Sequence, residues 1–583
     1  MVKGLVAQAE RWIESDPDEG TRQELRALLD AGDARLADRF AGPLVFGTAG
    51  LRGIIGAGET RMNVAVVRRA TAGLGAYLLE HVSDARARGV VIGYDGRRKS
   101  RTFAEQTAAV LLAAGLRVYL SKGVCPTPVV AFGVLKYEAA AGVMVTASHN
   151  PREYNGFKVY AENGAQIISP VDQHIAKGIE EAGPARSIGV ANLAEAVDED
   201  RLRYFGEDLD DAYCAAVGDL VPRGTGDRGL SIVYTALHGV GDPLVRRTLA
   251  EAGFQRVRSV AEQAKPDGSF PTVAFPNPEE PGAMDLVTAL AVREDAALVL
   301  ANDPDADRLS ACVRTQVGAY QQLSGNQVGV LLGHYLMERD QAVGDDSRGQ
   351  ALVITTIVSS PWLGCIAQDL DVAYDETLTG FKWVANCAMT REREHGQRFL
   401  FGYEEALGYT IGTVTRDKDG IGAALVLSVL AAQLHAQGRT LLDELERIAR
   451  RHGLFASKQR SIRFEGADGA LQMEAVMQRL RDEAPSALAG FAIEAVTDCQ
   501  AGTRRANGQS ESIALPKSNV MILGLAEGHR VIARPSGTEP KMKLYFDVRE
   551  QLVDGQSLAD AQERADATIE RLEAELLQLL GLS

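Results

Sequence analysis

Three aspartates in one short loop carry the clearest chemical signal of this 583-residue sequence. Asp303, Asp305 and Asp307 stand at positions i, i+2 and i+4, directly after the apolar run 297–300. Carboxylates this close repel one another unless a divalent cation lies between them, and hard oxygen ligands suit Mg²⁺ or Mn²⁺. An EF-hand is excluded because Arg308 stands where that loop needs glycine. The alternative to a metal loop is a solvated acidic turn, and the preceding buried-type strand favours the metal.

A serine follows a second apolar run, and its hydroxyl is a candidate nucleophile or phosphate carrier. Ser148 lies in a turn of small residues after Val143-Met144-Val145. Taken alone, a serine here would more often be a turn residue or a helix cap. His149 invites a Ser–His pair and is kept as a catalytic candidate. Adjacent side chains on an extended chain point opposite ways, however, so we expect His149 to be a poor base for Ser148.

Lys158 follows a turn signal ten residues after the serine. The pair Asn155-Gly156 predicts a tight turn, which would bring Lys158 back toward Ser148 as a proton shuttle. The alternative is a solvated surface lysine.

A dense group of phosphate donors lies near the C-terminus. It consists of Arg534, Ser536, Gly537, Thr538 and Lys541. Guanidinium binds phosphate through two hydrogen bonds, hydroxyls add donors, and glycine lets backbone N–H groups approach an anion. The sequence contains neither a Walker loop nor a convincing dinucleotide fingerprint, so nothing supports a nucleotide as ligand.

Two adjacent acids, Glu404 and Glu405, could accept hydrogen bonds from sugar hydroxyls. Paired acids would also suit a glycosidase, whose stereochemistry depends on a separation between carboxyl groups that sequence does not provide.

The elements that must position these residues are strands that end in polar loops. Five apolar runs, at 90–92, 143–145, 297–300, 399–401 and 531–533, stop abruptly in such loops. Ligands of α/β sheets gather at the carboxyl ends of strands. One such loop would be an ordinary turn, but five with this chemistry predict one cleft built by several domains.

Helical and strand-like segments alternate along most of the chain, which predicts α/β layers with mixed or parallel sheets. Residues 1–40 have helical spacing and predict a helical extension, and a long helix is expected from Ser557 to Leu580. The most apolar stretch, Ile421 to Leu434, is shorter than the roughly 20 residues that a membrane span needs, so we expect a buried helix there.

Composition narrows the function classes. Apolar residues make up 46% and charged residues 24%, as in an ordinary folded protein. The net charge of −16 disfavours nucleic acid or an anionic membrane as partner, since both are polyanions. Six scattered cysteines argue against a zinc ribbon or disulfide framework, and the early charges at the N-terminus argue against a secretory signal. We therefore expect a cytoplasmic protein, and the oligomeric state stays open.

Together these loops resemble the α-D-phosphohexomutase family of phosphoglucomutases and phosphomannomutases, from about Phe46 to Lys541. The matching segments are the phosphoserine loop Thr146-Ala147-Ser148-His149-Asn150-Pro151, the metal loop Asp303-Pro304-Asp305-Ala306-Asp307-Arg308, the sugar loop Gly402-Tyr403-Glu404-Glu405-Ala406 and the phosphate loop Arg534-Pro535-Ser536-Gly537-Thr538. The family's opening segment is similar to residues 46–53, where its arginine, which faces the active site, is Arg52.

The resemblance implies roles for the residues. Ser148 would carry the phosphate and join the three aspartates around one Mg²⁺ per active site. Lys158 would be a general acid or base. Substrate would be bound by Arg308, Lys382, Glu404, Arg534, Ser536, Gly537 and Thr538.

The resemblance also implies the fold: three similar mixed-sheet α/β domains and a smaller C-terminal α+β domain around a central cleft. We place the helical extension at 1–40, the phosphoserine domain at 41–210, the metal-loop domain at 211–318, the sugar-loop domain at 319–455 and the phosphate-binding domain at 456–583.

The implied activity is interconversion of glucose 1-phosphate and glucose 6-phosphate through glucose 1,6-bisphosphate. Many relatives have a serine where this chain has Ala406, and the sugar loop and N-terminal extension look more like the subgroup with phosphopentomutases and glucose-1,6-bisphosphate synthases. Phosphopentomutase, phosphomannomutase and sugar-bisphosphate synthase therefore stay open. A non-catalytic sugar-phosphate-binding protein is disfavoured, because binding alone needs no phosphorylatable serine.

Overall fold

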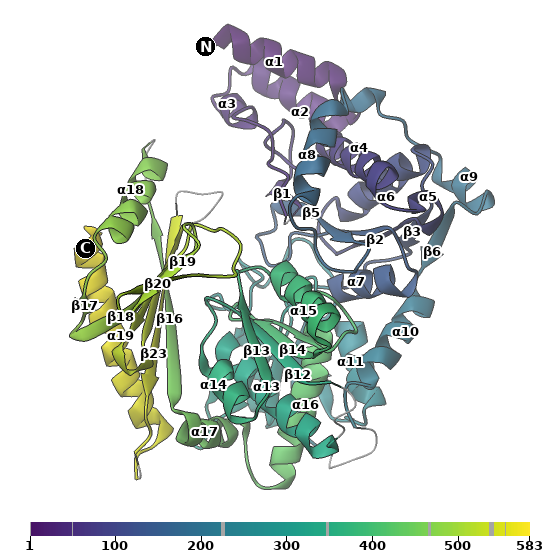
Figure 1. The fold of residues 1–583 in the computed structure, drawn as a ribbon. Coiled ribbons are helices and arrows are strands. Elements are labelled where there is room, and N and C mark those ends of the chain that lie inside the picture. The colour runs from purple at the N-terminus through teal and green to yellow at the C-terminus, as the bar shows by residue number, and fades with distance from the viewer. Residues whose placement is uncertain are drawn as a thin grey trace. The chain divides into compact units, whose positions relative to one another are not determined.

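Alternating β-branched and Ala/Leu-rich segments form alternating strands and helices in the computed structural model. It describes residues 2–48, 50–222, 228–344, 349–464, 468–535, 541–553 and 555–582. Two units are formed, one by residues 1–323 with 407–438 and the other by residues 324–406 with 439–583. Figure 1 shows the order of their elements by colour.

The first unit begins with three short helices, α1 (Val2–Ser15), α2 (Glu19–Asp30) and α3 (Arg35–Arg39). Helix α2 starts where Asp18 accepts a hydrogen bond from the backbone N–H of Gly20 at 2.8 Å, which satisfies a donor that the helix itself leaves free. Apolar side chains of the three helices cluster with Ala57, just beyond the first strand. The helical extension therefore packs on the domain that follows it.

The first sheet is mixed and has six strands in the order β1-β5-β4-β2-β3-β6. They are β1 (Leu51–Ile54), β2 (Val90–Tyr94), β3 (Val118–Ser121), β4 (Ala141–Val145), β5 (Tyr154–Ala161) and β6 (Leu202–Phe205). Strands β4, β2, β3 and β6 are parallel, and β5 runs antiparallel to both β1 and β4. Strands β2 and β4 are buried throughout, as the continuous apolar runs predict.

Helices cover this first sheet. They are α4 (Val64–His81), α5 (Ala85–Arg88), α6 (Ser100–Ala113), α7 (Thr127–Lys136), α8 (Val171–Glu181), α9 (Leu193–Asp198) and α10 (Glu207–Gly218). Helices α6 and α7 both contact β2 and lie on opposite sides of it in Figure 1. The carboxyl ends of β2 and β4 are thus left to the loops that follow them.

The second sheet is also mixed, in the order β11-β10-β9-β7-β8. Its strands are β7 (Ile232–Thr235), β8 (Val257–Ser259), β9 (Leu298–Ala301), β10 (Ser310–Arg314) and β11 (Tyr320–Gln322). Helices α11 (Asp242–Glu251), α12 (Asp285–Glu294) and α16 (Gly420–Ala436) pack near it, and strand β15 (Gly408–Ile411) precedes α16. Almost every residue of α16 is buried, which confirms the buried helix expected at 421–434.

The second unit contains the third α/β layer. Its strands β12 (Ala351–Thr356), β13 (Ala373–Thr377) and β14 (Arg398–Glu404) are parallel, with β12 between the other two. The helices are α13 (Gly325–Val343), α14 (Trp362–Asp369), α15 (Phe381–His395) and α17 (Leu441–His452).

The same unit ends in an antiparallel sheet in the order β16-β23-β22-β21-β18-β19-β20, with β17 beside β18. The strands are β16 (Leu454–Arg463), β17 (Ala487–Leu488), β18 (Phe491–Asp498), β19 (Thr503–Ala506), β20 (Gln509–Ser512), β21 (Met521–Leu525), β22 (Arg530–Pro535) and β23 (Lys541–Glu550), and the helices are α18 (Gly469–Asp482) and α19 (Leu558–Leu580). Helix α19 lies along β16 and β23 (Figure 1). The expected fold class, three α/β domains followed by a C-terminal domain with an antiparallel sheet, is confirmed.

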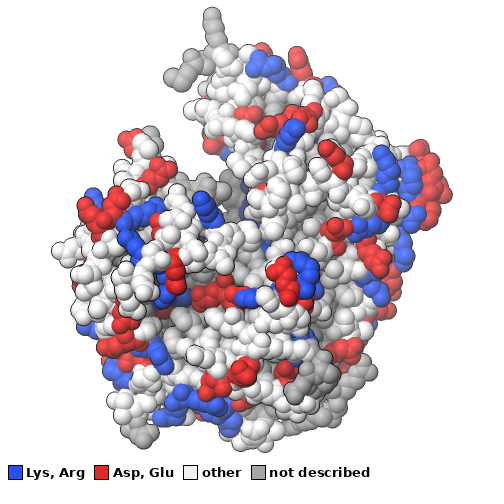
Figure 2. Space-filling model, in the orientation of Figure 1, with Lys and Arg blue, Asp and Glu red and all other residues white. Residues whose placement is uncertain are grey.

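Charges of both signs are intermixed on the face that Figure 2 presents, so the net charge of −16 is not gathered into one acidic region there. Among the described residues, no single helix is long and apolar enough to cross a membrane; α16 passes such a test only when joined to α17 across a bend.

Candidate active site

Ser148 and the aspartate loop meet in the first unit, at the carboxyl ends of β4 and β9. The Ser148 hydroxyl donates a hydrogen bond to Asp303 Oδ2 at 2.6 Å, and Ser148 is 3% exposed. Two segments that sequence analysis marked independently therefore form one site, as expected for polar loops at strand ends.

The serine loop is held by the loop after β2. The backbone N–H of Ser148 donates to Thr146 Oγ1 at 2.8 Å, and Thr146 Oγ1 donates to Asp95 Oδ2 at 2.7 Å. The Arg97 guanidinium donates to the carbonyl oxygens of Ser148 at 2.5 Å and Asn150 at 2.6 Å. Sequence analysis placed Asp95 and Arg97 in a strand-end loop but gave them no role; both position the serine.

The expectation that His149 points away from Ser148 is wrong. Ser148 has a φ of 49°, so the chain is left-handed rather than extended at this residue. His149 Nδ1 consequently lies 3.2 Å from Ser148 Oγ. Burial lowers the pKa of His149 well below its usual range, and the positive charges of Arg308 and Arg52 lower it further. The lowered pKa favours the neutral imidazole and makes it a weak base, in line with the expectation that His149 is a poor base for Ser148.

The three aspartates are almost completely buried, with exposures of 0 to 1%. One carboxylate oxygen from each lies within 4.8 Å of the others. Burial and the charges of Asp305 and Asp307 raise the pKa of Asp303 well above its usual range, which is the signature of carboxylates crowded without enough positive charge.

Two of these buried oxygens fit a metal ion. Asp305 Oδ1 and Asp307 Oδ1 have no hydrogen-bond partner, and a buried carboxylate oxygen left this way is costly. A hard divalent cation that takes oxygen ligands would satisfy both. The cluster could therefore hold a divalent metal, with Asp303 and the adjacent Ser148 hydroxyl beside it.

Lys158 reaches the site by strand pairing rather than by a turn. Asn155 and Gly156 lie inside β5, so the expected tight turn there is wrong. Residues 51–54 and 141–144 pair with β5 from its two sides, and Met144 is the partner of Lys158. Gly156 is required by this close pairing, because a Cβ atom would lie 2.6 Å from the carbonyl oxygen of Thr146.

The Lys158 ammonium lies between two aspartates, 2.7 Å from Asp305 Oδ2 and 2.8 Å from Asp307 Oδ2. Lys158 is 6% exposed, so the alternative of a solvated surface lysine is wrong. Burial lowers the pKa of Lys158, but the two carboxylates outweigh burial and raise it overall. The lysine is a cation in this arrangement.

A second lysine contacts the same cluster, and sequence analysis missed it. Lys418 Nζ lies 3.4 Å from Asp307 Oδ2 and 3.3 Å from Asp417 Oδ1. Asp417 accepts hydrogen bonds from the Tyr160 hydroxyl at 2.9 Å and from the Gln166 amide at 2.8 Å. The available signal was the charged segment 416–419 directly before the most apolar helix.

Thr127 is a further contact that the sequence pattern did not mark. Its hydroxyl, at the start of α7, donates to Asp305 Oδ2 at 2.6 Å. This contact helps to fix the carboxylate that also binds Lys158.

The two predicted arginines of the first unit lie at different places. The backbone N–H of Arg308 donates to Asp303 Oδ1 at 3.1 Å, and its Nε lies 3.8 Å from Asp307 Oδ1. Arg52 is exposed on β1 and donates to Asn150 Oδ1 at 2.8 Å, in the serine loop.

The second unit contains the remaining predicted residues. Glu404 ends β14 and accepts a hydrogen bond from the backbone N–H of Gly380 at 2.7 Å. Lys382 lies in the first turn of α15, two residues beyond that glycine. Arg534 lies on β22. The predicted residues Ser536, Gly537 and Thr538 fall outside the described part of the chain.

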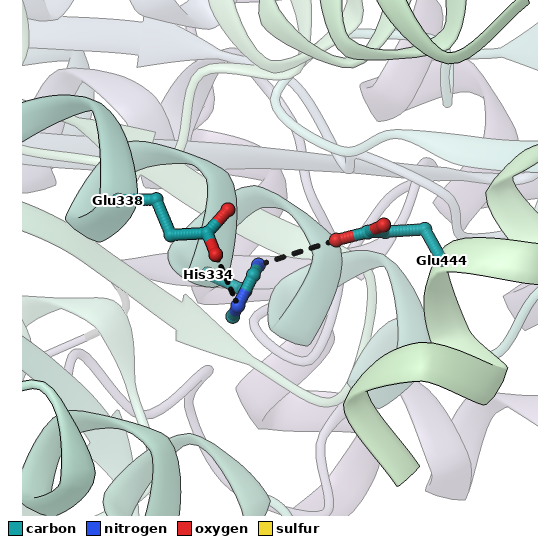
Figure 3. A group of neighbouring side chains, drawn as sticks. All are labelled: His334, Glu338 and Glu444. Atoms are coloured by element: carbon teal, nitrogen blue, oxygen red, sulfur yellow. Dashed lines mark ion pairs between the residues drawn. The ribbon is translucent and has the colours of Figure 1, made fainter. Parts of the chain in front are cut away.

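Another group of metal-type side chains lies in the second unit, between α13 and α17 (Figure 3). His334 Nδ1 lies 3.5 Å from Glu444, and His334 Nε2 lies 3.3 Å from Glu338. Both glutamates already pair with Arg447, at 2.7 and 3.1 Å. We therefore interpret the group as an ion-pair network that joins two helices.

The first unit thus offers a buried hydroxyl beside a metal-type carboxylate cluster, two ammonium groups and a neutral imidazole. This combination suits phosphoryl transfer, in which the hydroxyl carries the phosphoryl group and cations neutralise its charge.

Comparison with known proteins places the chain among enzymes of this kind. Residues 43–186, 211–318 and 324–451 match the models of α/β/α domains I, II and III of phosphoglucomutase/phosphomannomutase.

Curated relatives match most of the chain. A Haemophilus influenzae protein named "Probable phosphomannomutase" is 39% identical over 84% of this chain and 93% of its own length. A phosphoglucomutase of Staphylococcus epidermidis is 37% identical over 87% of this chain and 90% of its own. A human glucose 1,6-bisphosphate synthase is 35% identical over 92% of this chain and 89% of its own.

Proposed function

Because the chain belongs to the phosphoglucomutase/phosphomannomutase family and is therefore a phosphosugar mutase, we propose that it interconverts glucose 1-phosphate and glucose 6-phosphate. The reaction passes through a phosphoserine at Ser148 and a glucose 1,6-bisphosphate intermediate. The observation that carries the proposal is the 2.6 Å contact between Ser148 Oγ and Asp303 Oδ2. It supports a serine whose phosphate would lie at the metal cluster.

The first half-reaction forms a bond between phosphorus and the free sugar hydroxyl and breaks the bond between phosphorus and Ser148 Oγ. The resulting bisphosphate returns its other phosphate to Ser148, which leaves the isomeric monophosphate. Asp303, Asp305, Asp307 and Ser148 would hold a divalent metal, which would supply positive charge against the phosphoryl oxygens.

Protons must leave the sugar hydroxyl and reach Ser148 Oγ during the transfer. Lys158 holds a proton at Nζ between Asp305 and Asp307, and we assign it as the acid/base group. His149, 3.2 Å from Ser148 Oγ, can hydrogen-bond to that oxygen. Arg97 keeps the serine loop in place through two backbone carbonyls.

Substrate binding is assigned to the residues that the family resemblance marks. Arg52 and Arg308 supply charge near the phosphoserine loop. In the second unit, Glu404 and Lys382 bind sugar hydroxyls and Arg534, with Ser536, Gly537 and Thr538, binds the non-reacting phosphate. The six cysteines are all free, which supports a reducing, cytoplasmic setting.

A bisphosphate synthase is the second candidate, supported by the human relative of that name and by Ala406 in the sugar loop. Ribose and mannose phosphates are the alternative mutase substrates. Parallel assays with glucose, mannose and ribose 1-phosphates, and with an acyl-phosphate donor plus glucose 1-phosphate, separate the candidates. Net formation of bisphosphate from the donor would favour the synthase.

The direct test replaces the proposed phosphate carrier. Ser148→Ala should lower glucose 1-phosphate turnover by about 10⁴-fold and remove the phosphate that intact-mass analysis detects on the wild-type peptide. The exposed Ser187→Ala is the control and should retain both. Near-wild-type turnover by Ser148→Ala would contradict the proposed function.

A further inference from the structure

One face of strand β22 carries the predicted phosphate-binding arginine together with a second, largely buried arginine that has no assigned role. Arg530, Ile532 and Arg534 alternate along the strand and so share a face. On the neighbouring β23, Asp547, Tyr545 and Lys543 lie opposite them, in that order. The shared face thus has three cross-strand pairs. They are the ion pair Arg530–Asp547, the pair Ile532–Tyr545 and the cationic pair Arg534–Lys543.

The middle pair, Ile532 and Tyr545, packs against the third α/β domain. Ile532 and Tyr545 belong to one buried cluster with Ile357, Val358 and Leu378, which lie in loops after β12 and β13. This face of the C-terminal sheet is therefore apposed to the carboxyl ends of strands β12 and β13. The sugar loop begins in the last residues of β14, the neighbour of β12 in the same sheet.

The ion pair Arg530–Asp547 is connected to the sugar loop through Ser359. Arg530 donates to Asp547 Oδ2 through Nε at 3.0 Å and Nη2 at 2.8 Å, and Nη2 also donates to the carbonyl oxygen of Ser359. Ser359 Oγ in turn accepts the backbone N–H of Glu405 at 3.2 Å. A continuous set of contacts therefore runs from β22 to the residue that follows Glu404.

The residues that make this connection are largely buried. Ser359 is fully buried, Asp547 is 1% exposed, and the Arg530 side chain is 11% exposed. Asp547 Oδ1 also accepts the Ser457 hydroxyl at 2.6 Å, and Glu376 lies 3.6 Å from the Arg530 guanidinium. Charge-assisted hydrogen bonds in such surroundings are strong, and the planar guanidinium allows little rotation of one partner against the other.

We propose that Arg530 is a positioning residue that sets the spacing between Glu404 and Arg534, and thereby selects the length of sugar phosphate that the enzyme accepts. The proposal rests on the proposed function, in which Glu404 binds sugar hydroxyls and Arg534 binds the non-reacting phosphate. Arg530 lies four residues before Arg534 on the same strand, about 13 Å away. A change in the contacts of Arg530 with Asp547 and Ser359 would therefore shift the strand and move Arg534. A hexose and a pentose differ in the distance between their hydroxyls and phosphate, and a fixed spacing discriminates between them.

The test compares a hexose 1-phosphate with a pentose 1-phosphate, using glucose and ribose 1-phosphates. The double variant Arg530→Met/Asp547→Leu removes both buried charges at once, which often leaves stability nearly unchanged. We expect it to melt close to the wild-type temperature while the ratio of kcat/KM values for the two sugars moves toward unity by about tenfold, mainly through KM. Arg504→Gln breaks an exposed ion pair with Glu511 in the same sheet and should leave the ratio unchanged.

A milder variant keeps the test decisive if the double variant does not fold. Ser359→Ala retains the carbonyl oxygen that Arg530 binds. It removes the hydroxyl that accepts the Glu405 N–H and that also hydrogen-bonds with Thr356 Oγ1 at 2.9 Å, so the ratio should still move in the same direction. An unchanged ratio in Ser359→Ala, or in a folded double variant, overturns the proposal. Wild-type turnover and the phosphate on Ser148 are measured in the same experiment, and their absence would instead contradict the proposed function.

Discussion

Ser148 Oγ lies 2.6 Å from Asp303 Oδ2 although 155 residues separate them in the chain. The serine comes from the first α/β domain and the aspartate from the second, and both lie at the carboxyl ends of buried strands. A hydroxyl beside a metal-type carboxylate cluster is the arrangement that the proposed phosphoserine requires.

Removal of divalent metal should abolish turnover, because the unpartnered oxygens of Asp305 and Asp307 are the proposed ligands. Mg²⁺ added back should restore turnover and raise the melting temperature, since a cation that binds only the folded state stabilises it. Asp305→Asn should weaken this thermal response, whereas Asp371→Asn, far in sequence from the cluster, should not. A chelated enzyme with full activity would contradict the metal site.

Lys158→Met should lower kcat by about 10³-fold at saturating Mg²⁺, because it removes the proposed acid/base group. Lys158→Arg should not restore the rate, since a planar guanidinium replaces a compact ammonium between Asp305 and Asp307. Steady-state kinetics with glucose 1-phosphate provide the measurement. Lys418→Met, which loses longer contacts of 3.3 and 3.4 Å, is the comparison and should lower kcat less.

Gly156→Ala should destabilise the first unit by about 3 kcal/mol, because the added methyl group meets backbone rather than a movable side chain. The Cβ atom would lie 2.6 Å from the carbonyl oxygen of Thr146 and 2.7 Å from that of Leu51. Urea unfolding followed by circular dichroism measures the loss. Gly123→Ala is the matched control, since no atom lies within 4 Å of its added Cβ. Equal urea midpoints for Gly156→Ala and Gly123→Ala would contradict the prediction and show that β5 shifts to make room for the added methyl group.

Ala406→Ser should raise kcat/KM for glucose 1-phosphate by about fivefold, because one added hydroxyl supplies one hydrogen bond to a sugar hydroxyl. The same variant should change kcat/KM for ribose 1-phosphate less, so the ratio of the two constants is the quantity to measure. A ratio that does not move would mean that position 406 does not contact the sugar.

One local pattern predicted a side-chain cluster that the structure contains. The aspartate spacing after an apolar strand predicted a metal-type cluster, and the three carboxylates do lie together and buried. Periodicity likewise predicted α/β layers and the buried helix at 421–434. These features depend only on residue types and their spacing within one segment, and both can be read directly from the sequence.

Contacts between distant segments were decided only by the tertiary structure. His149 faces Ser148 because Ser148 adopts a left-handed φ of 49°, which few non-glycine residues do unless their surroundings impose it. Lys158 joins Asp305 and Asp307 because β5 is paired on both sides, although Asn155-Gly156 favours a turn locally. Lys418 enters from a segment more than 100 residues beyond the aspartates. The sequence by itself determined which groups could act; packing, through strand pairing and burial over long separations, determined which of them meet.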